Sequence, residues 1–387
     1  MPIKILILGD INSMFILNYV KELKAKMNCE VDIFTNPIQP QGKEYVKQFI
    51  KYFDNIYEIS KYNNEIISRI PKIRRILQIK NIANQIDNLG NYDICHIHYL
   101  EDIYGLIASQ IVKKSKKLVI SIYGSDFYRS KWWEKKIQHR IIKYAHKIIF
   151  INKQTLEEFS KYFKKIDKDK LKIKNYGLVT LRILRNIEHI SKKDCKKYFN
   201  ISTNSLIVTC GHNASQGNEH IKIIKSIEIV KHKLPDNILF LFPFTYGFVR
   251  EYFLKVKGLL DKSNLNYRVL TDFLSDYEVA QLRKASDIMI NLPISDQLSG
   301  SMQESLYTGN IVITGDWLPY KILEEKGIFM LKVSSVGEVG EKLLYSVNNL
   351  RNLKESCKRN SQIIWNISSW DKNINDWIHM YIELLQS

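Results

Sequence analysis

The stretch SDQLSGSMQESLYTGNIVITGDW, Ser295 to Trp317, decides the fold because it connects two apolar runs through a polar segment. The flanking runs 287–294 and 310–316 are typical of buried strands. Between them, small residues from Ser299 onward predict a helix start with free backbone N–H groups at its positive end. Such a start suits a phosphate or diphosphate, although a Ser-rich turn before a helix is also an ordinary N-cap. Trp317, in the turn that follows, is expected in the core.

The rest of the chain repeats this alternation of short strand-like runs and helix-length segments. The strand-like runs are 4–9, 31–35, 93–100, 117–124 and 147–152 in the first half, and 206–213, 237–244, 267–273, 287–294 and 310–316 in the second. Alternation of this kind is typical of parallel sheets with crossover helices on both faces. At 387 residues, the chain is also too long for one hydrophobic core.

We therefore predict an α/β fold with two Rossmann-like parallel-sheet domains facing a cleft. The N-terminal domain is expected over residues 1–180, a linker over 181–204 and the C-terminal domain over 205–365. The remaining residues, 366–387, are expected to form a helix that packs back on the N-terminal domain. Because ligands of open α/β sheets bind beyond the carboxyl ends of strands, the loops after the strands are the places to search.

Two acids accompany the helix start within the opening stretch. Glu304 lies one turn into the predicted helix, where it is placed to accept hydrogen bonds from a ribose diol, as an acid does in other nucleotide-binding folds. Asp296 lies eight residues earlier on the loop, within reach of the group that the diphosphate carries. The pattern favours a nucleotide whose diphosphate bears a further group.

The spacing of Asp296 and Glu304, D-x7-E followed by SLYTGNIVITGD, resembles the E-x7-E signature of the family 4 retaining glycosyltransferases of GT-B fold. The two-halved order and YGSD after a first-half strand also fit. The resemblance implies a nucleotide-sugar donor held mainly by the second domain and an acceptor held by the first. It also implies that Glu304 binds ribose, that Asp296 meets the donor sugar, and that Ser299, Gly300, Ser301 and Met302 hold the diphosphate.

The chain departs from this family in three places. Asp296 replaces the usual Glu and is one methylene shorter. Tyr123 stands where the family often has the His of His-Gly, and its ring offers an apolar surface to a donor sugar that lacks a 6-hydroxyl. The loop CGHNASQGNEHI lacks the Arg and Lys that the family places there, so His212 and His220 are its only candidate cations.

That loop, together with FPFTYG, is similar to the bacterial 4-acetamido-4,6-dideoxygalactose transferases of the lipid-linked enterobacterial common antigen pathway, which are inverting GT-B enzymes. His212, Asn213 and Tyr246 therefore join the predicted donor residues. The two resemblances imply opposite stereochemical outcomes. The outcome stays open, with retention preferred over inversion.

Three further residues follow first-half strands. His98 ends a strand that also contains His96, and a pair without a third ligand is more often packing than metal binding. Asp126 either contacts the acceptor or caps a helix. Gly9 lets the backbone approach a ligand closely, or simply forms a turn. We predict catalytic roles for Asp296, Asp126 and His98, and donor contacts for Gly9 and Tyr123.

The formal net charge of +18 is concentrated in residues 111–174, which hold 19 Lys and Arg against 6 Asp and Glu. A cationic surface attracts nucleic acid, anionic lipid or acidic substrates, and a lysine-rich genome bias can produce one without function. Trp beside Lys favours lipid, so Trp132, Trp133, Lys135 and Lys136 are predicted to bind a membrane. The chain shows no helix-turn-helix, RNP or zinc-finger pattern.

The sequence also bounds where the protein acts. It has neither an apolar run of about 18 residues nor a secretory signal, and its five cysteines form no C-x-x-C pair. We expect a cytoplasmic protein, peripheral on the inner face of the cell membrane, without metal or other cofactor.

The sequence as a whole predicts a glycosyltransferase that moves a hexosyl or deoxyhexosyl group from a nucleotide-diphosphate sugar to a hydroxyl. The expected acceptor is a lipid-linked saccharide in cell-surface polysaccharide or glycan assembly. Its expected partners are the donor, that acceptor and an anionic membrane surface, and not nucleic acid. Two alternatives stay open. One is a nucleotide-sugar 2-epimerase of the same fold, and the other is a basic nucleic-acid-binding protein.

Overall fold

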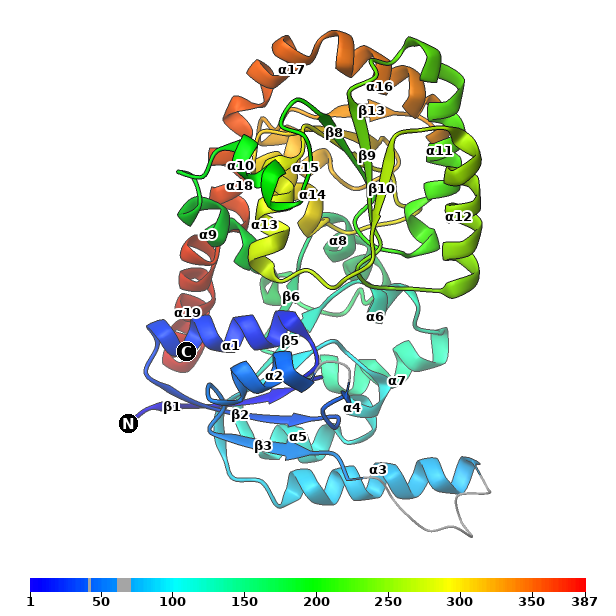
Figure 1. Cartoon of the computed structure of the whole chain (residues 1–387). Coiled ribbons are helices and arrows are strands. Elements are labelled where there is room, and N and C mark those ends of the chain that lie inside the picture. Colours follow the sequence, from blue (N-terminus) through cyan, green and yellow to red (C-terminus); the bar gives the residue numbers. More distant parts are fainter. Residues whose placement is uncertain (41–42, 61–70) are drawn as a thin grey trace. The chain divides into compact units, whose positions relative to one another are not determined.

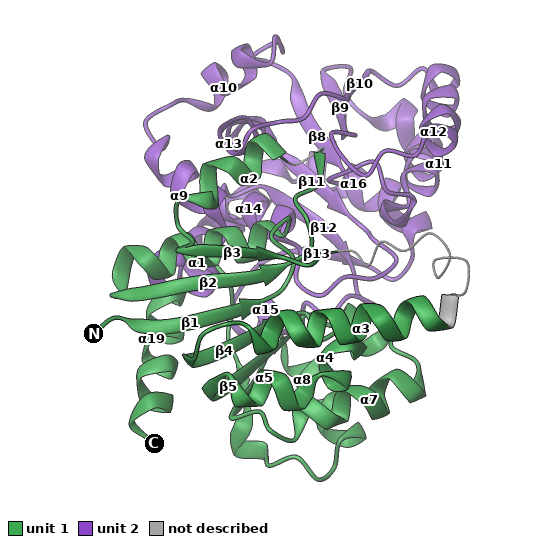
Figure 2. Cartoon of the chain, turned by 90° about the horizontal axis from the view of Figure 1, so that it is seen from below, with its two compact units in different colours: residues 1–177, 373–387 green, residues 178–372 purple. Residues whose placement is uncertain are grey.

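The computed structural model describes residues 1–40, 43–60 and 71–387 (Figure 1). The chain forms two compact units, which Figure 2 distinguishes by colour. Unit 1 comprises residues 1–177 and 373–387, and unit 2 comprises residues 178–372. Each unit contains one parallel sheet with helices on both faces. The predicted fold class, two Rossmann-like parallel-sheet domains, is confirmed.

Unit 1 is built on a seven-stranded sheet of order β3-β2-β1-β4-β5-β6-β7, in which every neighbouring pair is parallel. The strands are β1 (Ile3–Leu8), β2 (Cys29–Thr35), β3 (Asn55–Glu58), β4 (Tyr92–His98), β5 (Ser115–Ile122), β6 (Lys147–Phe150) and β7 (Leu171–Ile173). Strands buried on both faces are continuous apolar runs rather than alternating ones, as IKILIL in β1 illustrates. The order reverses between β1 and β4.

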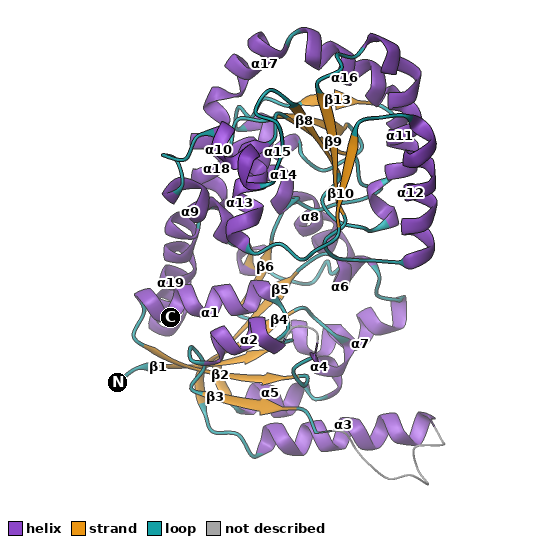
Figure 3. Ribbon diagram, in the orientation of Figure 1, coloured by secondary structure: helices purple, strands orange, loops and turns teal. Residues whose placement is uncertain are grey.

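The helices of unit 1 divide between the two faces of this sheet, as Figure 3 shows. The helices that precede β7 in the chain are α1 (Met14–Lys26), α2 (Lys43–Ile50), α3 (Pro71–Asp87), α4 (Asp102–Leu106), α5 (Ala108–Lys113), α6 (Ser125–Tyr128), α7 (Trp132–Ile142) and α8 (Lys153–Tyr162). Right-handed crossovers require this division, because the chain reverses its direction across the sheet after β3.

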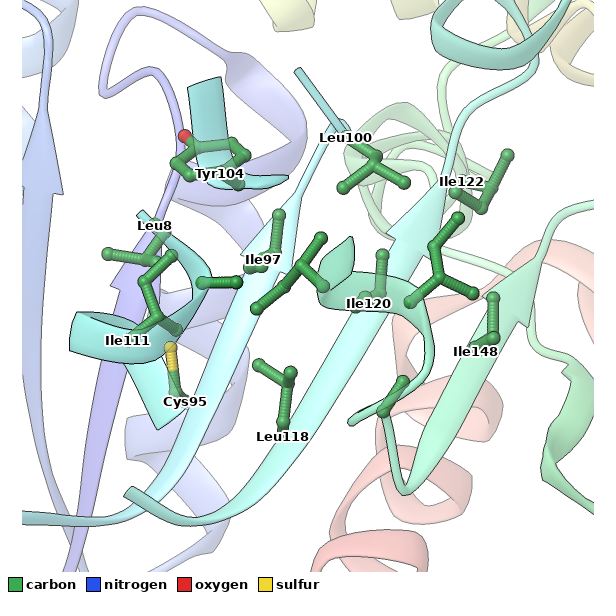
Figure 4. Close-up of a cluster of buried hydrophobic side chains, with 14 of the residues drawn as sticks. Leu8, Cys95, Ile97, Leu100, Tyr104, Ile111, Leu118, Ile120, Ile122 and Ile148 are labelled. Atoms are coloured by element: carbon green, nitrogen blue, oxygen red, sulfur yellow. The ribbon is translucent and has the colours of Figure 1, made fainter. Parts of the chain in front are cut away.

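The core on one face of this sheet joins side chains of its strands to side chains of the helices that cover that face, and the close-up in Figure 4 shows part of it. Leu8, Ile97 and Ile120 come from β1, β4 and β5, and Tyr104 and Ile111 come from α4 and α5. Burying each such side chain contributes about 1.5 to 3 kcal/mol relative to leaving it in water. The packing therefore holds the carboxyl ends of these strands in a fixed register.

Unit 2 repeats the plan with a six-stranded parallel sheet of order β10-β9-β8-β11-β12-β13. Its strands are β8 (Leu206–Cys210), β9 (Ile238–Pro243), β10 (Tyr267–Leu270), β11 (Ile288–Asn291), β12 (Ile311–Gly315) and β13 (Leu331–Val333). Its helices are α9 (Val179–Asn186), α10 (Lys192–Tyr198), α11 (His220–Val230), α12 (Arg250–Ser263), α13 (Asp276–Ala285), α14 (Gly300–Tyr307), α15 (Lys321–Glu325), α16 (Val339–Asn348), α17 (Leu350–Ser356) and α18 (Asn360–Ser368). Here the order reverses between β8 and β11.

Two segments, residues 181–204 and the last helix, can be compared with the predicted domain bounds. Residues 181–204, expected as a linker, contain most of α9 and all of α10 and lie within unit 2. Leu181 and Leu184 are buried in its core, so the Lys-rich composition conceals an amphipathic helix. The last helix, α19 (Trp370–Gln386), belongs to unit 1 from Asn373 onward. Across the described residues, no helix has both the length and the apolar character needed to cross a bilayer.

Candidate functional site

The reversal of strand order in unit 2 brings together the loops that follow β8 and β11. The N–H of Gly211 donates to the carbonyl of Ile290 at 2.9 Å, and the N–H of Ile294 donates to the carbonyl of Gly217 at 2.9 Å. Ligands of open α/β sheets bind at such a switch point, outside the carboxyl ends of the strands. The residues of these two loops therefore form the candidate site.

The loop after β8 depends on a glycine. Gly211 has a φ of +69°, and a Cβ there would lie 2.6 Å from Nε2 of His220. Both features exclude other residues at this position. His220 is buried, and its Nδ1 lies 3.2 Å from the Tyr252 hydroxyl. The loop is thus held tightly over the start of α11.

The two histidines of this loop, which are its candidate cations, both have a lowered pKa. Burial lowers the pKa of His220 to about 3, and burial together with the charge of Arg283 lowers the pKa of His212 to about 4. Both rings are therefore neutral at neutral pH. Asn213 instead fixes the loop, since its Oδ1 accepts from the N–H of Ser215 at 2.9 Å.

The loop after β11 leads into α14, whose start agrees with the predicted one. Ser299 is the N-cap, and its Oγ accepts from the N–H of Met302 at 3.3 Å. No described residue accepts a hydrogen bond from the N–H groups of Gly300 or Ser301, so these two donors remain available. Met302 points its side chain into the core, which leaves it no direct ligand contact through that side chain.

Asp296 is held by a tyrosine that the sequence did not mark. The hydroxyl of Tyr320 donates to Oδ2 of Asp296, and the N–H of Gln297 donates to Oδ1 at 2.7 Å. Burial raises the pKa of Asp296, while these hydrogen bonds oppose the rise. Asn291 in turn donates to the Tyr320 hydroxyl at 3.2 Å. The carboxylate is thereby fixed at the edge of the switch point.

Glu304 forms an ion pair inside unit 2. The Nε of Arg283, on α13, donates to Oε2 of Glu304 at 3.0 Å. The two residues are only 5% and 8% exposed. A cation therefore does lie near this loop system, although it comes from a neighbouring helix. In the sequence, Arg283 is marked only as a basic residue near a helix C-terminus, which is an ordinary position for Arg.

Trp317 and Tyr246, which lie near this site in the sequence prediction, are both exposed. Trp317, expected in the core, is 39% exposed and donates its indole N–H to the carbonyl of Pro293 at 3.0 Å. Its ring lies against Gly315, where a Cβ would clash at 2.5 Å. Tyr246 is half exposed, and its carbonyl accepts from the N–H of Ala214 at 2.9 Å, so the loop after β9 joins the loop after β8.

In unit 1, the predicted residues gather around Tyr123, which follows β5. Its hydroxyl lies 3.0 Å from Nδ1 of His98, and its ring stacks on Tyr176 with centroids 5.6 Å apart. Its backbone N–H donates to Oδ1 of Asp126 at 3.0 Å. Tyr123 is therefore fixed at both its backbone and its hydroxyl.

His98 and Asp126, for which catalytic roles are predicted, are both held by hydrogen bonds around Tyr123. Asp126 is buried, and it also accepts from the N–H groups of Leu100 and Gly124 at 2.9 Å each. Burial raises its pKa to about 6. His98 is buried as well, and burial lowers its pKa to about 3. Packing favours glycine at position 9, because a Cβ there would lie 2.7 Å from Cδ1 of Ile16 and 3.2 Å from Cβ of His98.

The four predicted membrane residues lie on α7 but differ in exposure. Trp132 is 66% exposed, and the Nζ of Lys136 lies 4.7 Å from its ring centroid. Lys135 instead places its Nζ 4.1 Å from the ring centroid of Phe127, and Trp133 is half-buried. Of these four residues, Trp132 and Lys136 are thus the exposed ones.

Comparison with known proteins is consistent with this architecture. Residues 4–156 match the family described as "Glycosyl transferase 4-like". A glycosyltransferase from Rickettsia africae ESF-5 is 16% identical, with a TM-score of 0.75 over 100% of this chain and 99% of that one. No curated protein sequence matches the chain significantly.

Two further solved structures cover nearly the whole chain. Anabaena Alr3699/HepE in complex with UDP is 12% identical, with a TM-score of 0.74 over 98% of this chain and 100% of that one. UDP-GlcNAc 2-epimerase from Neisseria meningitidis, bound to UDP-GlcNAc, is 16% identical, with a TM-score of 0.65 over 98% and 100%. The fold is therefore GT-B, and the resemblance to GT-B glycosyltransferases is confirmed at this level. The local similarity to 4-acetamido-4,6-dideoxygalactose transferases stays a prediction.

Proposed function

We propose that the protein is a GT-B glycosyltransferase that moves a sugar from a nucleotide-diphosphate sugar to a hydroxyl group. The observation that carries the proposal is the switch point of unit 2. There, two free N–H groups at the start of α14 lie in the same helix as a carboxylate paired with a buried arginine. A helix start of this kind binds phosphate, and an acid one turn later suits a ribose diol.

In this proposal the residues of unit 2 hold the donor. Gly300 and Ser301 donate to the diphosphate through their backbone, Glu304 accepts from the ribose, and Asp296 meets the sugar. Tyr320 keeps Asp296 in place through its hydroxyl. Catalysis then rests on positioning and on stabilising the charge of the leaving diphosphate and of the oxocarbenium-like sugar. The proposal requires no metal ion or other cofactor.

We assign the acceptor to unit 1, and we assign the fixed ring of Tyr123 to a contact with the donor sugar. His98 and Asp126 act there by holding that ring and its backbone. Since the Tyr123 hydroxyl is already bonded to His98, its ring is suited to a methyl group, and we propose a donor sugar without a 6-hydroxyl.

The acceptor is a lipid-linked saccharide at the inner face of the cell membrane, which the exposed Trp132 and Lys136 would approach.

A thermal-shift comparison tests the proposal. UDP, dTDP, GDP, ADP and their nucleosides are each added to the full chain, and at least one diphosphate is expected to raise Tm more than its nucleoside. A ligand at 100 times its Kd stabilises the native state by about 2.7 kcal/mol. Absence of a shift with every one of these diphosphates would contradict the proposed function.

A nucleotide-sugar 2-epimerase is the second candidate, favoured by the full-length structural match to the Neisseria enzyme. The two reactions differ in what happens to the donor alone. Proton NMR of a bound nucleotide sugar incubated without acceptor is expected to show no inversion at C2. Accumulation of the C2 epimer would replace the transferase assignment with the epimerase.

A further inference from the structure

Arg283 has more hydrogen-bond donors than the protein satisfies. A guanidinium carries five N–H donors and no acceptor. Its Nε donates to Glu304 at 3.0 Å, and among the described residues none accepts from its two terminal amino groups. The residue is only 5% exposed. A buried charge left largely unpaired is costly, so these amino groups call for an anionic oxygen partner.

The position of Arg283 points to the loops of the switch point. The loops 211–219, 244–249 and 292–299 contain neither Lys nor Arg. Burial and, after it, the positive charge of Arg283 lower the pKa of His212. Burial raises the pKa of Tyr246, and the charge of Arg283 opposes that rise, so its field reaches the loops after β8 and β9. Because His212 and His220 are neutral, this guanidinium supplies a positive charge that those loops themselves lack.

The carboxylate of Glu304 has one oxygen for Arg283 and one for a hydroxyl group of a ligand. Its Oε2 is bonded to Arg283, and no described residue donates to its Oε1. Arg283 therefore fixes the carboxylate while leaving one oxygen for a hydroxyl. The carboxylate fixes the guanidinium in turn, so that the plane of its terminal amino groups is set before a ligand arrives.

We propose that Arg283 is the phosphate-binding cation of the nucleotide-sugar site, contacting the donor's phosphate oxygens through its terminal amino groups while Glu304 holds its Nε. The inference rests on the proposed function. In it, Arg283 takes the place of the Arg and Lys that the loop after β8 lacks. Guanidinium groups bind phosphate oxygens in a planar, bidentate manner that lysine cannot reproduce. Arg283→Lys should therefore restore the binding only in part.

Titration calorimetry separates phosphate binding from nucleoside binding. The probes are whichever of UDP, dTDP, GDP and ADP binds the wild-type chain best, and its parent nucleoside. Arg283→Met is expected to weaken the diphosphate at least tenfold, about 1.4 kcal/mol, and the nucleoside less than twofold. Arg351→Met, at an exposed position of α17, is the matched control and should change neither.

A second pair of variants covers the case in which Arg283→Met does not fold, because it leaves Glu304 buried without a partner. Glu304→Gln is compared with Glu304→Gln/Arg283→Met, in which no charge of the pair remains. The double variant should still lose at least tenfold more diphosphate affinity than the single one. Equal affinities of the two variants, or equal losses for diphosphate and nucleoside, would overturn the role of Arg283 and leave the proposed function standing. If wild type binds no diphosphate, the proposed function fails together with this inference.

Discussion

At the scale of single residues, the buried pair of Glu304 and Arg283 combines a structural and a binding task. Removing one partner of a buried pair leaves an uncompensated charge, which typically costs about 3 to 5 kcal/mol. The carboxylate also keeps one oxygen without a protein donor. Substitutions at Glu304 should therefore affect stability and ligand binding by different routes.

We expect Glu304→Ala to lower the free energy of unfolding by about 3 kcal/mol, because Arg283 then lies buried without its partner. Glu304→Gln keeps the shape and an oxygen, so it should be more stable than Glu304→Ala while still weakening nucleotide-sugar binding by about 1.5 kcal/mol. Urea unfolding and titration calorimetry measure the two effects. An alanine variant as stable as wild type would show that the pair contributes nothing to folding.

His98 predicts a pH dependence of stability. Burial depresses its pKa to about 3 in the folded state, below the unfolded value of about 6.5. Its contribution is therefore fully present above pH 6.5 and is lost as the pH falls from 6.5 toward 3, by about 1.4 kcal/mol per unit. Chemical denaturation at pH 7, 6 and 5 should show a shallower loss in His98→Gln. The same slope in both proteins would refute this origin.

At the scale of elements, the loop after β8 depends on a backbone conformation that a glycine supplies. Gly211 and Gly309 share a φ of +69°, but only Gly211 lies against a side chain, His220. Gly309 has nothing within 4 Å of a built Cβ. The two positions thus separate the cost of the backbone conformation from the cost of the close contact.

Gly309→Ala should destabilise the protein by about 1 to 2 kcal/mol, which is the cost of a left-handed residue. Gly211→Ala should cost clearly more and also weaken nucleotide binding, because the Cβ must displace His220 at the candidate site. Thermal unfolding and nucleotide titration of the two variants provide the measurement. Equal losses of stability with unchanged binding would argue against a ligand role for this loop.

Helix α7 gives a prediction at the same scale. Replacing Trp132 and Lys136 with Ala should reduce sedimentation with phosphatidylserine vesicles several-fold, since a basic residue near an anionic surface contributes about 1 kcal/mol. The difference should shrink as salt rises. The matched control is Leu254→Ala/Lys255→Ala on α12, where Leu254 is also exposed. Indistinguishable sedimentation of the two variants would remove the assigned membrane surface.

At the scale of the whole molecule, the C-terminal helix α19 completes the core of unit 1. Trp377 and Tyr381 of α19 are fully buried, and the hydroxyl of Tyr381 lies 2.7 Å from that of Tyr19 and 2.6 Å from Nδ1 of His96. The last residues of the chain thus pack with α1 and β4, near the beginning of the sequence. Unit 1 is incomplete without them.

Trp377→Ala should therefore destabilise unit 1 by about 3 to 5 kcal/mol, the usual cost of truncating a buried aromatic residue. His379→Ala on the same helix is the control, because His379 is exposed and its Nδ1 lies 3.2 Å from Oε1 of Glu383 at the surface. Hydrogen exchange of the β1 and β4 amides reports the stability of unit 1 directly. Unchanged exchange in Trp377→Ala would mean that unit 1 does not depend on α19.

The sequence by itself determined the alternation of strands and helices, the fold class, and the start of α14 at Ser299. Each of these follows from local patterns: the apolar runs of buried strands and the preference of Ser for the N-cap depend on near neighbours only. The spacing of Asp296 and Glu304 is local as well. Their separation by one loop and one helical turn is therefore visible before any tertiary contact is known.

The tertiary structure alone decided which partners these acids meet. Arg283 reaches Glu304 from a different helix, Tyr320 reaches Asp296 from beyond the next strand, and Tyr381 reaches Tyr19 across almost the whole chain. No periodicity encodes such pairs, because packing of whole elements sets the distance between side chains that are remote in sequence. The same packing turned Asp126 toward backbone N–H groups and left Trp317 half exposed.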